Sequence, residues 1–103
     1  MDEISQLHTF DTITLEALHT HMFFGEVDAV SSYNACNFIL KSNLLYADAQ
    51  LNIVLNSSGG DCNEGFAVID TMTASRLPVM TTGVGSILSM GVLILSAGAK
   101  GQR

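Results

Sequence analysis

The chain has 103 residues, of which 48% are hydrophobic and 14% charged, a balance that excludes a disordered polypeptide and predicts one compact domain. Ten acidic residues against four basic ones give a formal charge of −6, and without a basic cluster the sequence does not favour a nucleic-acid or anionic-membrane partner. Cys36 and Cys62 lie far apart with no CxxC spacing, so we expect no metal site, no disulfide framework and no cofactor.

Two segments indicate whether the chain is secreted or spans a membrane. The first residues, MDEISQLH, contain acids and no apolar stretch, which is not the pattern of a signal peptide, so a cytoplasmic location is the default expectation. Residues 77–99 carry no charge and are long enough to span a bilayer, for which about twenty residues suffice. Pro78 and Gly83 interrupt that stretch, and it divides into a strand-like and a helix-like half around Gly85. We therefore expect no membrane span.

The first half of the chain predicts a strand followed by a helix. After weak alternation over residues 10–15, residues 21–24 predict a short buried strand that Gly25 closes. Asp28 is placed to cap a helix over residues 28–41. The side chains predicted to face a sheet recur at helical spacing, and they are Ala29, Tyr33, Cys36, Ile39 and Leu40, with Asn34, Asn37 and Lys41 facing water.

The second half repeats that alternation twice. Residues 51–55 (LNIVL) predict a strand that stops at the NSSGG run, and Asp61 with Glu64 three residues later indicates a capping box. Residues 79–84 predict a third strand, residues 85–88 a turn, and residues 89–97 a third helix that Gly98 caps. The apolar stripe predicted for the second helix is Phe66, Ile69 and Met72. Such alternation is typical of a layered α/β fold with a partly parallel sheet.

Two of the predicted strands run into turns that contain Gly and Ser, and the chemistry of open α/β folds gathers at such strand ends. Ser89 lies at a helix start behind Gly85, where it is either an activated nucleophile or simply the helix N-cap. Gly59 and Gly60 leave room for a substrate, and one of their N–H groups together with that of Met90 is suited to hold an oxyanion.

Two segments resemble the ClpP protease family. LNIVLNSSGGDCNEGFAVIDTM is similar to its stretch of strand, NSPGG and helix with a YDTM-like end, and SILSMGVLILSAGAKGQR is similar to its SMG, apolar helix and AGAKGKR. Gly60 and Ser89 fall in register with the oxyanion glycine and the nucleophile of the family. HMFFGEV and FDTITLEAL are fainter matches, so the resemblance runs from about Phe10 to Arg103.

The resemblance implies a ClpP/crotonase-like fold of ββα repeats with a partly parallel sheet. It also implies a serine endopeptidase in which Ser89 attacks the peptide carbonyl and the Gly60 and Met90 N–H groups hold the oxyanion. Gly59, Asp61 and Cys62 would line the substrate, and Gly91 would allow close packing behind the nucleophile. The implied partners are peptide or unfolded-protein substrates, further copies in stacked heptameric rings, and an AAA+ unfoldase that feeds the chamber.

The sequence departs from the family pattern at several positions. Ser58 replaces a usual proline, Asp61 and Cys62 replace small or apolar residues, and Ile87 and Leu88 replace small ones. The three histidines all precede Ser89, whereas the catalytic His and Asp of the family follow its AGAKGKR segment. We therefore expect residues 1–103 to form a single partial domain, the N-terminal half of the family fold, that is inactive without the missing His and Asp.

Other functions remain open. One is a non-catalytic subunit that associates with or modulates a full-length ClpP ring. Another is a different member of the superfamily, such as a signal-peptide peptidase or an enoyl-CoA hydratase relative. A nucleotide site at Gly83-Val84-Gly85 is disfavoured, because Leu88 occupies the third glycine position of that fingerprint.

Overall fold

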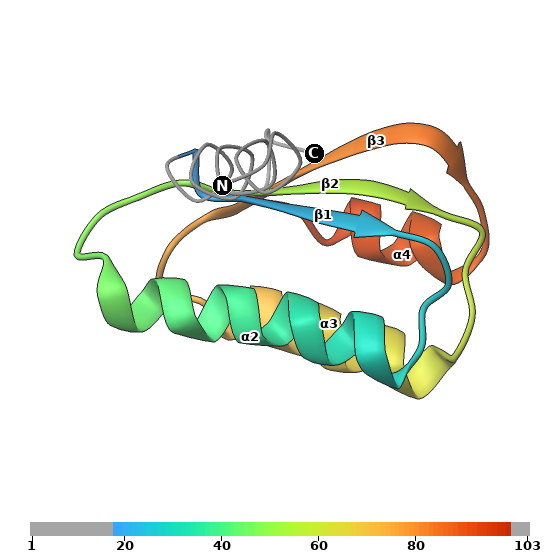
Figure 1. Ribbon diagram of the computed structural model, residues 1–103, viewed down its shortest axis with the longest axis horizontal. Coiled ribbons are helices and arrows are strands. Elements are labelled where there is room, and N and C mark those ends of the chain that lie inside the picture. Colours follow the sequence, from blue (N-terminus) through green and yellow to red (C-terminus); the bar gives the residue numbers. More distant parts are fainter. Residues whose placement is uncertain (1–17, 100–103) are drawn as a thin grey trace, which may run out of the picture.

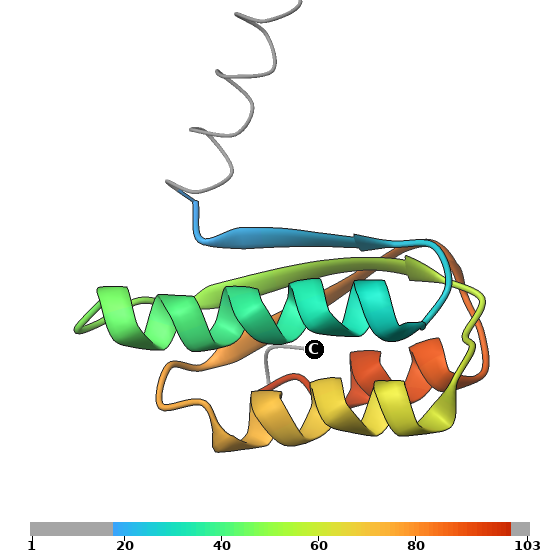
Figure 2. The same cartoon turned by 60° about the horizontal axis from the view of Figure 1, so that its bottom comes forward.

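The computed structural model describes residues 18–99, which form three strands and three helices in strict alternation. All three strands pair in parallel, in the order β1-β2-β3, and the helices lie on one face of the sheet (Figures 1 and 2). The elements are β1 (Thr20–Phe24), α2 (Ala29–Leu45), β2 (Leu51–Ser57), α3 (Cys62–Ala74), β3 (Val79–Ile87) and α4 (Met90–Ser96). The predicted α/β layering is confirmed. The predicted alternation over residues 10–15 lies outside the described residues.

The central strand β2 carries the core. Its side chains alternate strictly, with Leu51, Ile53 and Leu55 fully buried toward the helices. The predicted strand over residues 51–55 is confirmed and continues for two more residues. The rest of the buried apolar cluster comes from all the other elements and from the loops, and it comprises Phe23, Val27, Ala35, Ile39, Val68, Met72, Leu77, Val79, Met90 and Ile94.

Strand β1 is confirmed in position, but the prediction that it is buried is wrong. Only Phe23 is buried, whereas Met22 and Phe24 are about half exposed. β1 pairs only with β2, and the alternation of a strand turns Met22 and Phe24 to the face that no described helix covers. A short apolar run does not by itself reveal that one face of its sheet has no described helix packed on it.

Helix α2 begins as predicted, but its buried face is rotated from the predicted one. The Asp28 side chain accepts from the Ser31 N–H, and the Ser31 hydroxyl accepts from the Asp28 N–H, which completes a capping box. Of the predicted face, Ala29, Tyr33 and Leu40 are exposed. The buried residues are Ser32, Ala35, Ile39 and Ser42.

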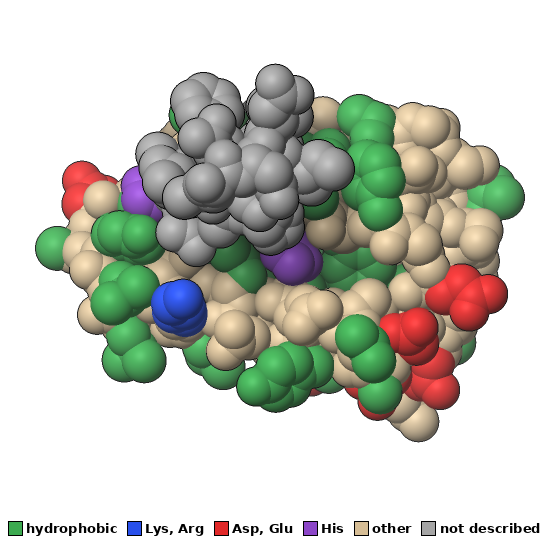
Figure 3. All heavy atoms as spheres, in the orientation of Figure 1, with side chains coloured by type: hydrophobic (Ala, Val, Ile, Leu, Met, Phe, Trp, Pro, Cys, Tyr) green, Lys and Arg blue, Asp and Glu red, His purple; other side chains and the backbone are tan. Residues whose placement is uncertain are grey.

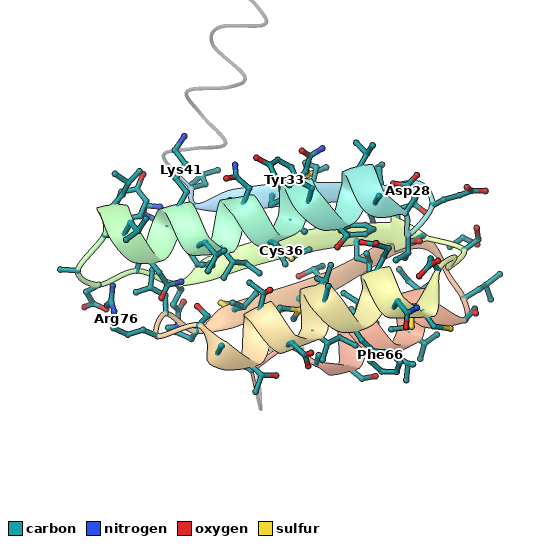
Figure 4. All side chains as sticks on the ribbon, turned by 90° about the horizontal axis from the view of Figure 1, so that it is seen from below. Asp28, Tyr33, Cys36, Lys41, Phe66 and Arg76 are labelled. Carbon is teal, nitrogen blue, oxygen red and sulfur yellow. The ribbon has the colours of Figure 1, made fainter. Side chains whose placement is uncertain are left out.

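The reason for that rotation is that α2 packs against α3 as well as the sheet. The Ser32 hydroxyl donates to the Glu64 carbonyl at 3.2 Å, and the Cys36 thiol contacts the Ala67 carbonyl at 3.6 Å. Figure 4 shows Cys36 on the side of α2 that is turned toward α3. Small polar side chains allow this close approach, and hydrophobicity alone does not identify them as buried.

Helix α3 begins at the predicted cap, since the Asp61 side chain accepts from the Glu64 N–H at 3.0 Å. In the predicted stripe Met72 is buried and Ile69 is half-buried, but Phe66 is half-exposed. Gly65 and Val68 are buried instead, because α3 turns this side toward α4. A methyl group at Gly65 would collide with the side chain of Met90.

The uncharged segment divides into a strand and a helix, as predicted, but the turn predicted over residues 85–88 is wrong for residues 85–87, which belong to β3. β3 continues beyond the predicted end to Ile87, and a bulge lies opposite Asn56, so that Leu55 pairs with Gly83 while Ser57 pairs with Ile87. α4 is short, and Gly98 follows its last residue by two positions. Among residues 18–99, no helix combines the length and apolar character that crossing a bilayer requires.

Candidate active site

Three loops meet at the carboxyl edge of the sheet, where each strand gives way to a helix. The loop after β1 donates the Gly25 N–H to the Asn56 carbonyl and the Val27 N–H to the Gly59 carbonyl, both at 2.9 Å. The loop after β3 donates the Leu88 N–H to the Ser57 carbonyl at 3.0 Å. β2 and its glycine turn therefore fix the other two loops in place.

Ser89 occupies the N-cap position of α4, but it does not act as a cap. Its hydroxyl makes no capping hydrogen bond, and its backbone has φ 53° and ψ −125°. His19 is the only other described residue, apart from glycines, that has a positive φ. Such a conformation costs about 1–3 kcal/mol, so the surrounding structure must hold it. The capping interpretation of Ser89 is wrong, and its side chain is exposed.

Gly59 brings the glycine turn directly against Ser89. A methyl group built on Gly59 would lie 2.8 Å from the Cβ of Ser89, 3.1 Å from its Oγ and 3.1 Å from the Met90 nitrogen. Gly59 is buried and has φ +105°, a conformation that only glycine adopts without strain. Two segments that are distant in the sequence are thus in contact at this point.

Gly60 follows Gly59 and Met90 follows Ser89, so their backbone N–H groups flank this contact, and neither has an acceptor among residues 18–99. The N–H groups on either side of Gly60 are both engaged. The Gly59 N–H donates to the Ser57 hydroxyl at 3.1 Å, and the Asp61 N–H donates to the Val27 carbonyl at 2.8 Å. The next amides of α4 are engaged as well, because Gly91 donates to Leu88 and Val92 donates to Ser89.

The other predicted site residues surround this contact. Asp61 and Cys62 are exposed at the start of α3, and the thiol of Cys62 is free. Acidic side chains gather at this end of the molecule (Figure 3), where exposed Glu26 and Asp28 join Asp61. Gly91 is buried so closely behind Ser89 that a methyl group on it would lie 2.8 Å from the Ser57 carbonyl oxygen.

The described histidines lie at the other end of the sheet. His21 pairs with Ile53, four residues before Ser57, which separates it from the glycine turn by about 13 Å along the strands. Its ring stacks on Phe38 with centroids 5.3 Å apart, and burial lowers its pKa. The His19 ring meets Tyr46 edge-on at 4.4 Å. Neither reaches Ser89, and His8 lies outside the described residues.

Three residues of the site went unpredicted. Asn56 accepts from the Ser86 N–H at 3.0 Å and fills the bulge of β3. Ser57 accepts from the Gly59 N–H of its own turn through its hydroxyl and from the Leu88 N–H of the loop after β3 through its carbonyl. Gly65 makes room for Met90. A glycine inside a helix costs about 1 kcal/mol relative to alanine, so Gly65 did carry a signal of close packing in the sequence.

Comparison with known proteins agrees with this architecture. Residues 7–103 match the Clp protease family. Proteolytic subunit 2 of the ATP-dependent Clp protease from Rhodococcus jostii (strain RHA1) is 37% identical over 83 residues, which cover 80% of this chain and 43% of that protein. The proteolytic subunit from Streptococcus mutans serotype c is 41% identical over 75 residues, 68% of this chain and 38% of the relative.

A third relative, the proteolytic subunit from Streptococcus agalactiae serotype V, is 40% identical over 87 residues. That match covers 80% of this chain and 42% of the relative, so the chain spans about two fifths of the length of the curated relatives it matches. The family match extends over nearly all of the 103 residues. This chain therefore belongs to the Clp protease family.

Proposed function

We propose that this chain is a ClpP-type serine endopeptidase subunit in which Ser89 is the nucleophile. The observation that carries the proposal is that the Gly60 and Met90 N–H groups have no acceptor among the described residues, and that they flank the contact of Gly59 with Ser89, an exposed residue whose hydroxyl does not cap its helix. Preorganised donors of this kind stabilise the charge that develops in acyl transfer. The names of the relatives, proteolytic subunits of Clp proteases, support the same reaction class.

In the proposed reaction the Ser89 Oγ attacks the peptide carbonyl carbon and gives up its proton. A C–O bond forms, and the carbonyl oxygen becomes an oxyanion that accepts from the Gly60 and Met90 N–H groups. The C–N bond then breaks, the leaving amine takes up the proton, and water later hydrolyses the acyl-enzyme.

The proton step needs a general base that the described residues do not place near Ser89. His19 and His21 lie at the opposite end of the sheet. Loss of the base in a serine protease lowers kcat by about 10⁴–10⁶-fold. We therefore propose that residues 1–103 form one partial domain that is inactive by itself, and that a His and its carboxylate must be supplied in addition.

The substrate side of the proposal involves Gly59, Asp61 and Cys62. Gly59 has no side chain to obstruct the approach to Ser89, and Asp61 and Cys62 are exposed just beyond the turn. We propose that they line a peptide or unfolded-protein substrate. The acidic character of this end of the molecule favours basic or neutral side chains next to the scissile bond.

The assembly is proposed from the resemblance and from exposed apolar surface. We expect a homo-oligomer of the heptameric-ring type fed by an AAA+ unfoldase, working in the cytoplasm, where the free thiols of Cys36 and Cys62 stay reduced. The large apolar side chains that are most exposed in the described structure are Leu44, Val30, Tyr33, Leu45 and Leu18. Such surface is typical of a subunit that packs against others.

The same surface favours a second candidate function, a non-catalytic subunit that associates with or modulates a full-length ClpP ring. Met22 and Phe24, about half exposed on the face of the sheet that no described helix covers, would take part in such packing. Mixing the chain with an intact ClpP ring and separating the mixture by size exclusion tests this alternative. Co-elution supports it, and elution of the chain at its own volume excludes it.

A fluorophosphonate probe tests the main proposal. We expect slow labelling of the isolated chain, confined to Ser89 and lost in the Ser89→Ala variant. Rapid stoichiometric labelling would show that the chain is not inert. Labelling of other serines with Ser89 left untouched would exclude Ser89 as the nucleophile.

A further inference from the structure

Ser57 occupies the point where the glycine turn and the nucleophile loop are joined. It is the last residue of β2, is 2% exposed, and is one of four buried polar residues among those described. A buried hydroxyl at a strand end costs free energy unless it is hydrogen-bonded. Its partners therefore show what it does.

The hydroxyl of Ser57 orients the glycine turn. Its Oγ accepts from the Gly59 N–H at 3.1 Å in a buried environment. Because the Asp61 N–H is directed to the Val27 carbonyl, the amide between them, that of Gly60, is the one left without an acceptor in the described structure. The bond to Ser57 thus helps to select which N–H of the turn stays available.

The backbone of Ser57 fixes the segment that carries Ser89. Its carbonyl accepts from the Leu88 N–H at 3.0 Å, one residue before Ser89. Two residues after Ser89, Gly91 packs so closely that a methyl group on it would lie 2.8 Å from the same carbonyl oxygen. Ser57 therefore restrains both the glycine turn and the loop that carries Ser89, and it contacts that loop before and after Ser89.

We propose that Ser57 is a positioning residue of the oxyanion hole, whose hydroxyl holds the Gly60 N–H in line with that of Met90. This inference rests on the proposed function. The hydroxyl touches neither substrate nor the reacting atoms, and it acts through the Gly59 amide. Its loss would leave the Gly59 N–H buried without a partner, and the turn would then rotate to satisfy it.

A Ser89→Cys variant allows a test that needs no general base, because a thiolate forms at neutral pH without one. p-Nitrophenyl acetate acylates the introduced sulfur through a tetrahedral oxyanion and releases p-nitrophenolate. Iodoacetamide alkylates the same sulfur by displacing iodide, with no oxyanion. Peptide-level mass spectrometry separates the introduced thiol from those of Cys36 and Cys62, and N-acetylcysteine amide supplies the ratio of the two rates for a free thiol.

The Ser89→Cys parent tests the proposed function first. A ratio of acylation to alkylation above that of the free thiol supports an oxyanion hole, and an equal ratio refutes the proposed function itself. If the Ser89→Cys variant shows the raised ratio, Ser57→Ala is added to it. We expect the double variant to be acylated about tenfold more slowly or worse, while its alkylation rate stays within about twofold, because an oxyanion donor is misplaced. If Ser57→Ala lowers the acylation and alkylation rates equally, or lowers neither rate, the proposed role of Ser57 is wrong.

Ser58→Ala is the matched control, because it removes the same atoms from the neighbouring residue, which is exposed. We expect it to change neither rate. Ser57→Thr keeps the hydroxyl and is expected to retain most of the acylation rate. Should Ser57→Ala fail to fold, amide hydrogen exchange of the unsubstituted chain decides: Gly59 is expected to be protected and Gly60 to exchange freely. Equal exchange of the two amides would overturn the proposal.

Discussion

The side chain of Ser89 packs directly against the α-carbon of Gly59, so that a methyl group on Gly59 would lie 2.8 Å from the Ser89 Cβ. Gly25 has almost the same φ, +103° against +105°, yet nothing lies within 4 Å of a methyl group built there. Alanine substitutions at Gly25 and Gly59 therefore separate the free energy lost to an unfavourable φ from the free energy lost to a steric clash.

We predict that Gly25→Ala costs about 1–3 kcal/mol of stability, which is the strain of the left-handed backbone alone. Gly59→Ala is expected to cost at least about 1 kcal/mol more, because the new methyl group overpacks the site. It is also expected to block fluorophosphonate labelling of Ser89. Urea denaturation of both variants gives the comparison, and equal free energies of unfolding would contradict the observed packing.

The packing of Gly65 against Met90 leads to a second prediction. Alanine normally stabilises a helix by about 1 kcal/mol relative to glycine. We expect Gly65→Ala to destabilise instead, by about 1–3 kcal/mol, because its methyl group meets the Cγ and Cε of Met90. The double-mutant cycle with Met90→Ala should show a favourable coupling of at least about 0.5 kcal/mol. A stabilised Gly65→Ala variant would refute this contact.

Asn56 should hold the bulge of β3 just ahead of the nucleophile loop. Its side-chain oxygen accepts from the Ser86 N–H, and the side chain fills the space next to Gly85. We predict that Asn56→Ala costs about 1 kcal/mol and speeds hydrogen exchange at Ser86. Asn56→Asp keeps an acceptor oxygen and should preserve that protection. Unchanged exchange at Ser86 in the alanine variant would show that the bond does not hold the bulge.

Burial of His21 predicts how stability depends on pH. Burial lowers its pKa in the folded state below the ordinary value of 6.5. The unfolded chain then binds the proton more readily, so the free energy of unfolding falls as the pH drops below about 6.5 and levels off below the folded-state pKa. His21→Gln removes this contribution. Urea midpoints at pH 8 and pH 5 should therefore differ less in the variant than in the parent, and an equal difference would exclude His21 as a source.

The order of elements was predictable because their ends are marked by local chemistry. Asp28 and Asp61 cap helices through their own side chains, and the glycine turns stop the strands, so both signals act within a few residues. Which face of a helix is buried depends on neighbours far apart in the sequence. Tyr33 and Phe66 were placed on the wrong faces because the contact of α2 with α3, and of α3 with α4, selects small residues.

The candidate site was predictable in its residues but not in its supports. The resemblance to the ClpP family predicted that the glycine turn and Ser89 belong to one site, and the contact of Gly59 with Ser89 agrees with it, while their catalytic roles stay a prediction. The sequence does not single out Ser57 and Asn56, because serine and asparagine are common in any turn. Their roles depend on contacts between strand ends that are far apart in the sequence.

The roles proposed for Ser89 as nucleophile and for the Gly60 and Met90 N–H groups as oxyanion donors can be tested together by a crystal structure of the chain after prolonged reaction with a fluorophosphonate. We expect a bond from phosphorus to the Ser89 Oγ, with the phosphonyl oxygen about 2.7–3.1 Å from the nitrogens of both Gly60 and Met90. An adduct whose phosphonyl oxygen points to solvent, or one formed on another serine, would contradict the proposed roles.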